Sequence, residues 1–276
     1  MKLRCKDTYL SLDHVAVMGV LNVTPDSFSD GGLWLDADEA IAHALEMVDH
    51  GASIIDVGGE STRPGADPVS EDEELRRVIP VVEGIRARTP APISIDTRKP
   101  SVAERAVAAG ATIINDTLGE AGDEAMDDLA AKTGAAIVVM HSRGSPATMR
   151  ELTDYDDLVV DVREWLSRRA DRLLEAGVTR DAICLDPGYG FAKDPAQSLV
   201  LLRRLEEIVE LGYPVLVGTS RKSFIGKTLD LPEDQRIEGT AATAAWAITR
   251  GAHILRVHDV EPIVRTVRML EAITEA

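Results

Sequence analysis

The sequence has little of several features that would mark particular classes of protein. Its 276 residues include two cysteines, Cys5 and Cys184, which lie far apart and in no metal-ligand spacing. They are expected to be free thiols, because this pattern fits neither a disulfide framework nor a zinc cluster. No apolar run reaches about 18 residues and the N-terminus has no apolar leader, so we expect a cytoplasmic protein without a membrane span.

Basic residues are also few relative to acidic ones. There are 30 Lys and Arg against 47 Asp and Glu, which gives a net charge of -17. This balance disfavours binding to nucleic acid or to an anionic membrane, so an anionic ligand would need a local basic pocket. The sequence also has no Walker motif and no dinucleotide fingerprint in a strand context, which disfavours ATP and NAD chemistry.

Short runs rich in Val and Ile do recur, and they alternate with longer stretches of helical period. The expected strands are 15–21, 53–57, 92–95, 112–114, 135–140, 182–185, 214–217 and 253–257. Eight such units in a chain of this length predict one domain, residues 1–276, folded as a TIM (β/α)8 barrel. The helix expected after the second strand would bury Leu75, Val78, Ile79 and Val82. A longer helix, 156–176, would bury Leu158, Val162, Trp165, Leu166, Leu173 and Leu174.

Polar residues follow nearly every expected strand, where the loops of a barrel converge on one rim. Four of them, Asp96, Asn115, Asp186 and Lys222, suit a planar heterocycle, because carboxylates accept paired N–H donors and an amide or ammonium satisfies ring atoms. A salt bridge at the rim, such as Lys222 with Asp186, is the alternative interpretation.

Arg256 and His258 lie two residues apart on one strand and therefore point to the same side. With Asn22 and a contribution from Arg221 they would make a clamp for a diphosphate. Mg²⁺ would suit such a site, with Asn22 as the candidate ligand, because this ion binds against phosphates with few protein groups. The alternative for His258 is a rim histidine bonded to backbone.

Glycine and proline punctuate three loops near the same rim. Loops 22–32 and 58–68 are expected to act as active-site lids. Gly188 and Gly190 would let the backbone approach a ligand closely, with Phe191 available for stacking.

The sequence GVLNVTPDSFSDGG at 19–32 and DVGGESTRPG at 56–65 closely resemble the two signature loops of dihydropteroate synthases. Further segments resemble the remaining motifs of that family in the same order: 94–97, 114–116, 140–141, 186–193, 220–226 and 256–260. The resemblance covers residues 15 to 270. It implies a transferase of folate biosynthesis that condenses 6-hydroxymethyl-7,8-dihydropterin pyrophosphate with 4-aminobenzoate.

The resemblance also implies roles for residues. The pterin would be bound by Asp96, Asn115, Met140, Asp186, Phe191 and Lys222. The diphosphate and Mg²⁺ would be bound by Asn22, Arg256 and His258, with Asn22 as the metal ligand. The 4-aminobenzoate would be bound by Thr62, Arg63, Pro64, Ser220 and Lys222, while Phe28 and Asp30 belong to the first loop. The catalytic set would be Asp96, Lys222, Arg256, His258 and Asp30.

The family mechanism resembles an SN1 path, in which diphosphate leaves before the arylamine attacks. The resemblance further implies a homodimer and inhibition by sulfonamides. Apolar faces on the last helices make Trp246, Ile263 and Val267 candidate interface residues, and a buried helix face explains them equally well. Two other functions are weighed: a methyltetrahydrofolate:corrinoid methyltransferase of the same barrel type, and a non-catalytic pterin-binding paralogue. The chain departs from the usual pattern at Ala192, where Gly is common, at Gln197-Ser198-Leu199, and at Ser142.

Overall fold

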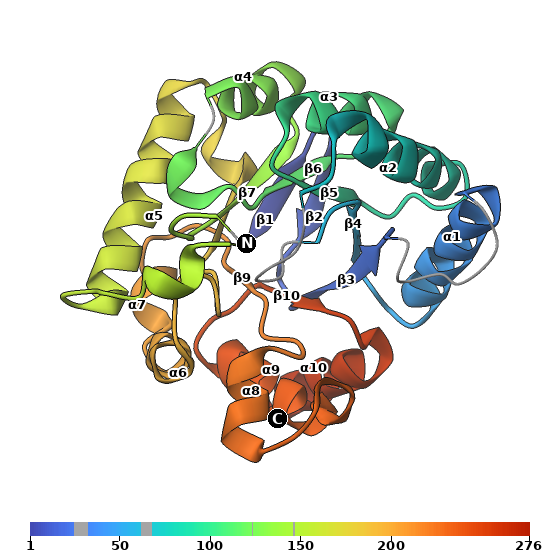
Figure 1. Ribbon diagram of the computed structural model, residues 1–276. Coiled ribbons are helices and arrows are strands. Elements are labelled where there is room, and N and C mark those ends of the chain that lie inside the picture. The colour runs from blue at the N-terminus through green and yellow to red at the C-terminus, as the bar shows by residue number, and fades with distance from the viewer. Residues whose placement is uncertain (25–32, 62–67, 123, 146) are drawn as a thin grey trace.

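Eight parallel strands form a ring that is surrounded by helices (Figure 1). The computed structural model describes residues 1–24, 33–61, 68–122, 124–145 and 147–276, with backbone only at 33–36 and 121. The order of the strands in the sheet is β8-β7-β6-β5-β4-β3-β10-β9, and a parallel bridge between Leu185 and Val215 joins its two edges. The prediction of a TIM barrel is therefore confirmed.

All eight expected strands are present, with ends displaced by at most two residues. They are β3 Ala16–Asn22, β4 Ile54–Gly58, β5 Ile93–Thr97, β6 Ile113–Asp116, β7 Ala136–Met140, β8 Ile183–Asp186, β9 Leu216–Val217 and β10 Ile254–Val257. Alternate residues of each strand face outward or inward. In β4, for example, Ile55 and Val57 pack under the helices, while Ile54 belongs to the core inside the barrel.

The helices outside the ring bury one face each against the strands. They are α1 Leu33–Asp49, α2 Glu71–Arg86, α3 Pro100–Ala109, α4 Glu124–Thr133, α5 Leu158–Glu175, α6 Pro195–Arg203, α7 Glu206–Val209, α8 Ser223–Leu229, α9 Ile237–Thr249 and α10 Val260–Thr274. Among the described residues, none of these helices is both long and apolar enough to cross a membrane.

Helices α2 and α5 show where the expected apolar stripes hold and where one fails. In α2, Val78 and Val82 are fully buried, and Ser70 caps the first turn by accepting a hydrogen bond from the amide of Glu73. In α5, Leu173 is buried but Leu174 is 37% exposed, so the prediction for Leu174 was wrong. Adjacent helical residues point about 100° apart, which places Leu174 beside the buried stripe rather than on it.

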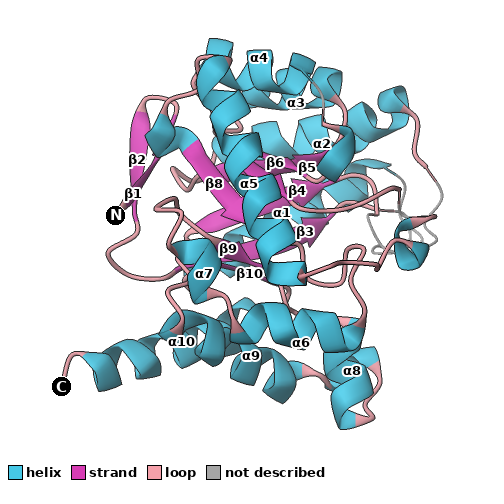
Figure 2. Cartoon of the chain, turned by 90° about the vertical axis from the view of Figure 1, so that its left-hand side faces the viewer, coloured by secondary structure: helices cyan, strands magenta, loops and turns pink. Residues whose placement is uncertain are grey.

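The N-terminal residues form a hairpin that the sequence did not predict. Strands β1 Lys2–Cys5 and β2 Thr8–Ser11 pair antiparallel, and the hairpin lies at one end of the barrel (Figure 2). Leu3 and Cys5 are buried in the same inner core as Cys184. Both cysteines are free, as expected, and both are buried.

The candidate dimer residues have different environments. Ile263 and Val267 of α10 are buried in the core beneath that helix, so for these two residues the alternative of a buried helix face holds and not the interface. Only Trp246 of α9 is exposed, at 41%. Its indole N–H donates to the carbonyl of Leu202, and the guanidinium of Arg250 covers its ring.

Candidate active site

A pocket opens where the carboxyl ends of the strands meet. It is lined by Asp96, Asn115, Thr117, Met140, Asp186, Tyr189, Phe191, Gly218, Lys222 and Arg256. All six residues predicted to bind a pterin are in this set, although they come from five different strand ends. Their convergence follows from barrel closure, because inward positions at the ends of parallel strands face one space.

Arg256 lies between two carboxylates in this pocket. Its Nε donates to Oδ2 of Asp56 and its Nη2 to Oδ2 of Asp96, each at 2.7 Å. Asp56 is fully buried in the middle of β4 and also accepts a hydrogen bond from Nδ2 of Asn115 at 3.2 Å. This one carboxylate therefore orients two of the predicted ligand-binding residues, although no role was predicted for Asp56.

The pKa of Asp96 depends on its burial and on these charged neighbours. Burial raises the pKa of Asp96 and the charge of Asp56 adds to the rise, while Arg256 and a hydrogen bond from Thr117 oppose it; the resulting pKa is about 7. The Thr117 hydroxyl donates to Oδ1 of Asp96 at 3.3 Å. A carboxyl group with a pKa near neutrality in a pocket is a common feature of active sites.

Asp186 and Lys222 form the opposite part of the pocket. Oδ1 of Asp186 accepts a hydrogen bond from the amide of Gly188 at 2.7 Å. Burial raises the pKa of Asp186, while the Gly188 amide and the charges of Lys222 and Arg256 lower it. The ammonium of Lys222 lies 4.1 Å from the centre of the Phe191 ring. The pocket therefore combines two carboxylates, one ammonium and an aromatic wall.

Two residues of the predicted anion clamp, His258 and Arg221, are held by other side chains of the protein. His258 is held by Ser220, whose Oγ lies 3.1 Å from Nδ1 and 3.2 Å from the backbone nitrogen of His258. Arg221, which has a φ of 58°, forms a two-bond ion pair with Asp259. These contacts join the exits of β9 and β10, and they tie Arg221 to Asp259 rather than aiming it at a ligand.

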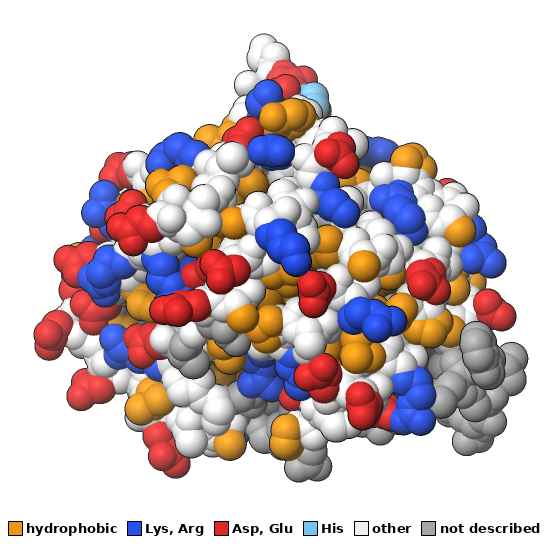
Figure 3. Space-filling view, turned by 90° about the horizontal axis from the view of Figure 1, so that it is seen from above, with side chains coloured by type: hydrophobic (Ala, Val, Ile, Leu, Met, Phe, Trp, Pro, Cys, Tyr) orange, Lys and Arg blue, Asp and Glu red, His pale blue; other side chains and the backbone are white. Residues whose placement is uncertain are grey.

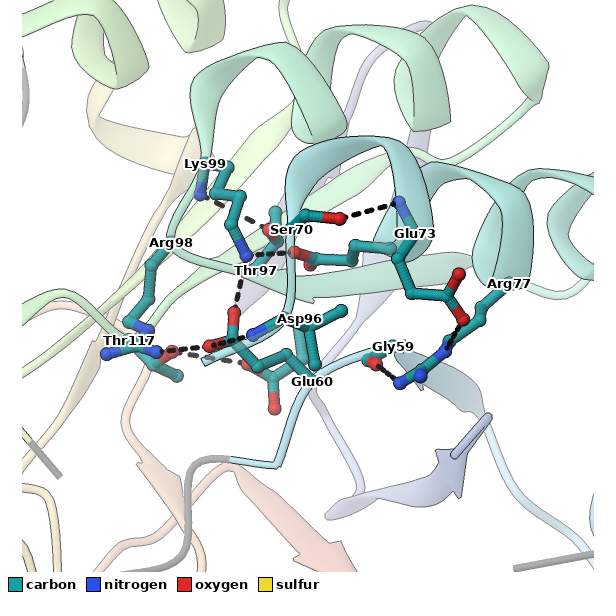
Figure 4. Close-up of polar contacts among 12 residues, drawn as sticks. Gly59, Glu60, Ser70, Glu73, Arg77, Asp96, Thr97, Arg98, Lys99 and Thr117 are labelled. Carbon is teal, nitrogen blue, oxygen red and sulfur yellow. Dashed lines mark hydrogen bonds and ion pairs between the residues drawn. The ribbon is translucent and has the colours of Figure 1, made fainter. Parts of the chain in front are cut away.

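A charged network fixes the start of the second loop (Figure 4). The Glu60 carboxylate, on a residue only 8% exposed, accepts hydrogen bonds from Arg98 at 2.8 Å and from Lys99 at 2.5 Å. It also accepts one from the amide of Val69 at 3.4 Å. Lys99 contacts the buried carboxylate of Glu74 at 2.5 Å as well. Glu60 lies within the motif at 56–65, but this network was not predicted from the sequence.

The remaining predicted residues divide into two groups. Asn22 ends strand β3 and pairs in register with Gly58, so it faces the same rim as Asp96. Phe28, Asp30, Thr62, Arg63 and Pro64 lie outside the described residues. Over the described part of the face drawn in Figure 3, acidic and basic side chains are interspersed.

The chain is similar in sequence to a known family of enzymes. The family model described as "Pterin binding enzyme" matches residues 18–258. The dihydropteroate synthase of Bacillus subtilis is 52% identical over 256 residues, which are 93% of this chain and 87% of the relative. The dihydropteroate synthase of Escherichia coli K12 is 47% identical over 276 residues, which are 100% of this chain and 98% of the relative.

Solved structures of similar proteins share the whole fold. The Yersinia pestis dihydropteroate synthase in a sulfonamide drug complex has a TM-score of 0.93 and 43% identity, with 100% of both chains covered. The Xanthomonas albilineans dihydropteroate synthase with 4-aminobenzoic acid has the same TM-score and identity, covering 100% of this chain and 98% of that one.

Proposed function

Because the chain belongs to the pterin-binding enzyme family and is a dihydropteroate synthase, we propose that its pocket binds the dihydropterin ring of 6-hydroxymethyl-7,8-dihydropterin pyrophosphate. The observation that carries this proposal is the convergence of Asp96, Asn115, Asp186, Lys222 and Phe191 on one pocket. Carboxylates accept the paired N–H donors of a pterin, the amide and ammonium satisfy its oxygen and nitrogen atoms, and Phe191 offers a ring for stacking.

In the proposed reaction the nitrogen of 4-aminobenzoate forms a bond to the pterin methylene carbon. The bond from that carbon to the diphosphate oxygen breaks, pyrophosphate takes the electron pair, and the amine loses a proton. On an SN1-like path the diphosphate leaves first. The carboxylates of Asp96 and Asp186 would then stabilise the pterin cation, while Arg256 and His258 stabilise the charge on the leaving group.

Mg²⁺ is proposed as the metal of this site, with Asn22 as its protein ligand. Among the described residues there is no cluster of His, Cys, Asp and Glu that could hold a metal by itself. A single amide oxygen at the rim nevertheless fits Mg²⁺, which keeps several waters and binds through substrate phosphates. When bound, the ion would neutralise charge on the diphosphate. Asn22→Ala should raise the Mg²⁺ concentration needed for half-maximal activity, and an unchanged requirement would remove Asn22 from this role.

The second substrate is proposed to lie near Ser220 and Lys222, with Thr62, Arg63 and Pro64 from the second loop. Sulfonamides should compete with 4-aminobenzoate for this position, and we infer that the chain is a sulfonamide target. Inhibition by sulfamethoxazole that 4-aminobenzoate does not relieve would contradict this assignment.

A cytoplasmic location and a homodimer are proposed on the resemblance to the family. Trp246 is the candidate contact that remains on the surface. Sedimentation of the wild type and of Trp246→Ala would test the dimer, because loss of dimer in the variant would place this residue in the interface. Sedimentation of the wild type as a monomer would exclude the dimer.

The central experiment follows dihydropteroate formation and pyrophosphate release in the presence of Mg²⁺, with and without 4-aminobenzoate. We expect product that depends on 4-aminobenzoate and that is lost in Lys222→Ala and Asp186→Asn. Pterin binding without product would indicate the non-catalytic paralogue. Methyl transfer from methyltetrahydrofolate to a corrinoid protein would indicate the methyltransferase.

A further inference from the structure

The turn after strand β8 carries Phe191 into the pocket through an unusual backbone conformation. Residues Gly188, Gly190 and Ala192 all have positive φ values, of 72°, 76° and 49°. Glycine adopts such values freely, but the Cβ of an alanine makes them unfavourable. Ala192 is buried, so it is held in this conformation inside the protein and not at a free surface.

Lys193, the next residue, supplies contacts that hold this turn. It is 6% exposed. Its Nζ lies 2.9 Å from the carbonyl oxygen of Phe191, 3.3 Å from the carbonyl oxygen of His141 and 2.9 Å from Nδ1 of His141. The hydroxyl of Tyr155 donates to the carbonyl of Ala192 at 2.8 Å. The carbonyls of Phe191 and Ala192 are thus both fixed by side chains.

These contacts connect two walls of the pocket. His141 directly follows Met140 at the end of β7, and Phe191 follows β8; both Met140 and Phe191 line the pocket. The backbones of the two segments also touch, because a Cβ added to Gly188 would lie 2.0 Å from the carbonyl oxygen of His141. Lys193 therefore joins the wall formed after β7 to the wall formed after β8.

The contacts of Lys193 are available in either protonation state. Burial lowers the pKa of Lys193 to about 7; the charges of Arg143 and Lys222 also lower it, and those of Asp186 and Glu120 raise it. An ammonium group has three N–H donors for the three contacts. A neutral amine can donate to both carbonyls and accept a hydrogen bond from Nδ1–H of His141.

We propose that Lys193 is a positioning residue for pterin binding. By holding the carbonyls of Phe191 and His141, it keeps the turn in the left-handed conformation that places the Phe191 ring against Lys222. This inference rests on the proposed function, because the wall that it concerns is that of the pterin site. Lys193 itself is outside the lining of the pocket and would act through Phe191.

The test compares wild type, Lys193→Met, Ala192→Gly and the double variant. Affinity is measured by fluorescence titration with 6-hydroxymethylpterin, and KM is measured for both substrates. Lys193→Met should weaken pterin affinity about tenfold, because it removes hydrogen bonds to buried groups. The KM for 4-aminobenzoate should change by less than about twofold. In the Ala192→Gly background the loss of pterin affinity should shrink to about threefold, because glycine adopts the positive φ without help.

Controls distinguish failure of the proposed function from failure of the inference about Lys193. Lys132→Met removes a lysine whose side chain is 77% exposed and should bind pterin like the wild type. A wild type that does not bind pterin would contradict the proposed function. Wild-type binding together with equal binding by Lys193→Met would overturn the inference, and so would the same loss in both Ala192 backgrounds.

A second variant decides the question if Lys193→Met does not fold. Tyr155→Phe removes only the hydrogen bond to the Ala192 carbonyl, and circular dichroism would verify its fold. It should weaken pterin affinity about threefold, and again by less in the Ala192→Gly background. Unchanged affinity in folded Tyr155→Phe would show that the turn does not need side-chain support, and would overturn the proposal.

Discussion

Nε of Arg256 lies 2.7 Å from Oδ2 of Asp56, a carboxylate with no exposed surface. The two residues are 200 positions apart in the sequence. Asp56 also binds the amide of Asn115, so one buried charge fixes the orientation of two pocket side chains. The same Arg256 contacts Asp96. Three charged side chains, Arg256, Asp56 and Asp96, are therefore linked at the base of the pocket.

Asp56→Asn should both destabilise the protein and impair its activity. The variant keeps the shape of the side chain but leaves Arg256 with one carboxylate, and disrupting a buried ion pair costs about 3 kcal/mol. We expect the free energy of unfolding in urea to fall by about this amount, and kcat/KM to fall at least about tenfold as Arg256 and Asn115 lose their orientation. Asp171→Asn, at an exposed position, is the control. Wild-type stability and kcat/KM in Asp56→Asn would refute the central role of this carboxylate.

The sequence predicted the strands well because each is a short apolar run that ends in polar residues. It did not reveal Asp56, because this carboxylate lies inside the run Ile54–Gly58 and its partner Arg256 is brought near only when β3 and β10 pair. Thr117 and Lys193 were missed for the same reason, since Thr117 contacts Asp96 of β5 and Lys193 contacts His141, which follows β7. The hairpin at Lys2–Ser11 was missed because its strands are short and mix charged with apolar residues.

Glu60→Gln should weaken the network at the start of the second loop. Burial alone would raise the pKa of Glu60, but the hydrogen bond from Lys99 and the charges of Arg98 and Lys99 lower it overall. The stabilising contribution of this carboxylate is therefore present above its unfolded pKa of 4.5 and is lost as the pH falls. Because Glu60 also binds the amide of Val69, it joins residues on both sides of the positions predicted to bind 4-aminobenzoate.

The expected result for Glu60→Gln is a KM for 4-aminobenzoate raised about tenfold, with a smaller change in the KM for the pterin substrate. Steady-state kinetics with each substrate varied in turn would measure this difference. Glu164→Gln removes an exposed carboxylate that pairs with Arg168 and should behave like the wild type. Equal changes in both KM values would show that Glu60 acts on overall folding and not on the second substrate.

Cys5 and Cys184 should be unreactive in the native protein. Both are buried, and burial raises the pKa of the Cys5 thiol to about 12 and also raises that of Cys184. Little thiolate is then present at neutral pH, and the thiolate is the reactive form. Titration with a disulfide reagent should detect both thiols in guanidinium chloride and neither of them within minutes in buffer. Rapid native reaction would show that the hairpin does not cover the inner end of the barrel.

The pH dependence of kcat/KM should identify Asp96 as a group that titrates near neutrality. Its pKa is raised from 3.8 to about 7, so the native state binds this proton more tightly than the unfolded chain. The associated stability is present below pH 3.8 and is lost as the pH rises toward 7. Activity should change in the opposite direction, rising with an apparent pKa near 7, because the ionised carboxylate is the form that can stabilise a cation.

Two substitutions should shift this rise of kcat/KM with pH, the acidic limb of the profile, in opposite directions. Thr117→Val removes the hydroxyl that donates to Oδ1 of Asp96 and should shift the limb to higher pH. Asp56→Asn removes the neighbouring negative charge that raises the pKa of Asp96 and should shift the limb to lower pH. Asp96→Asn should abolish the limb together with most of the activity. If both shifts have the same sign, the limb belongs to another group, since a group that lacks contacts with Thr117 and Asp56 would not respond to them oppositely.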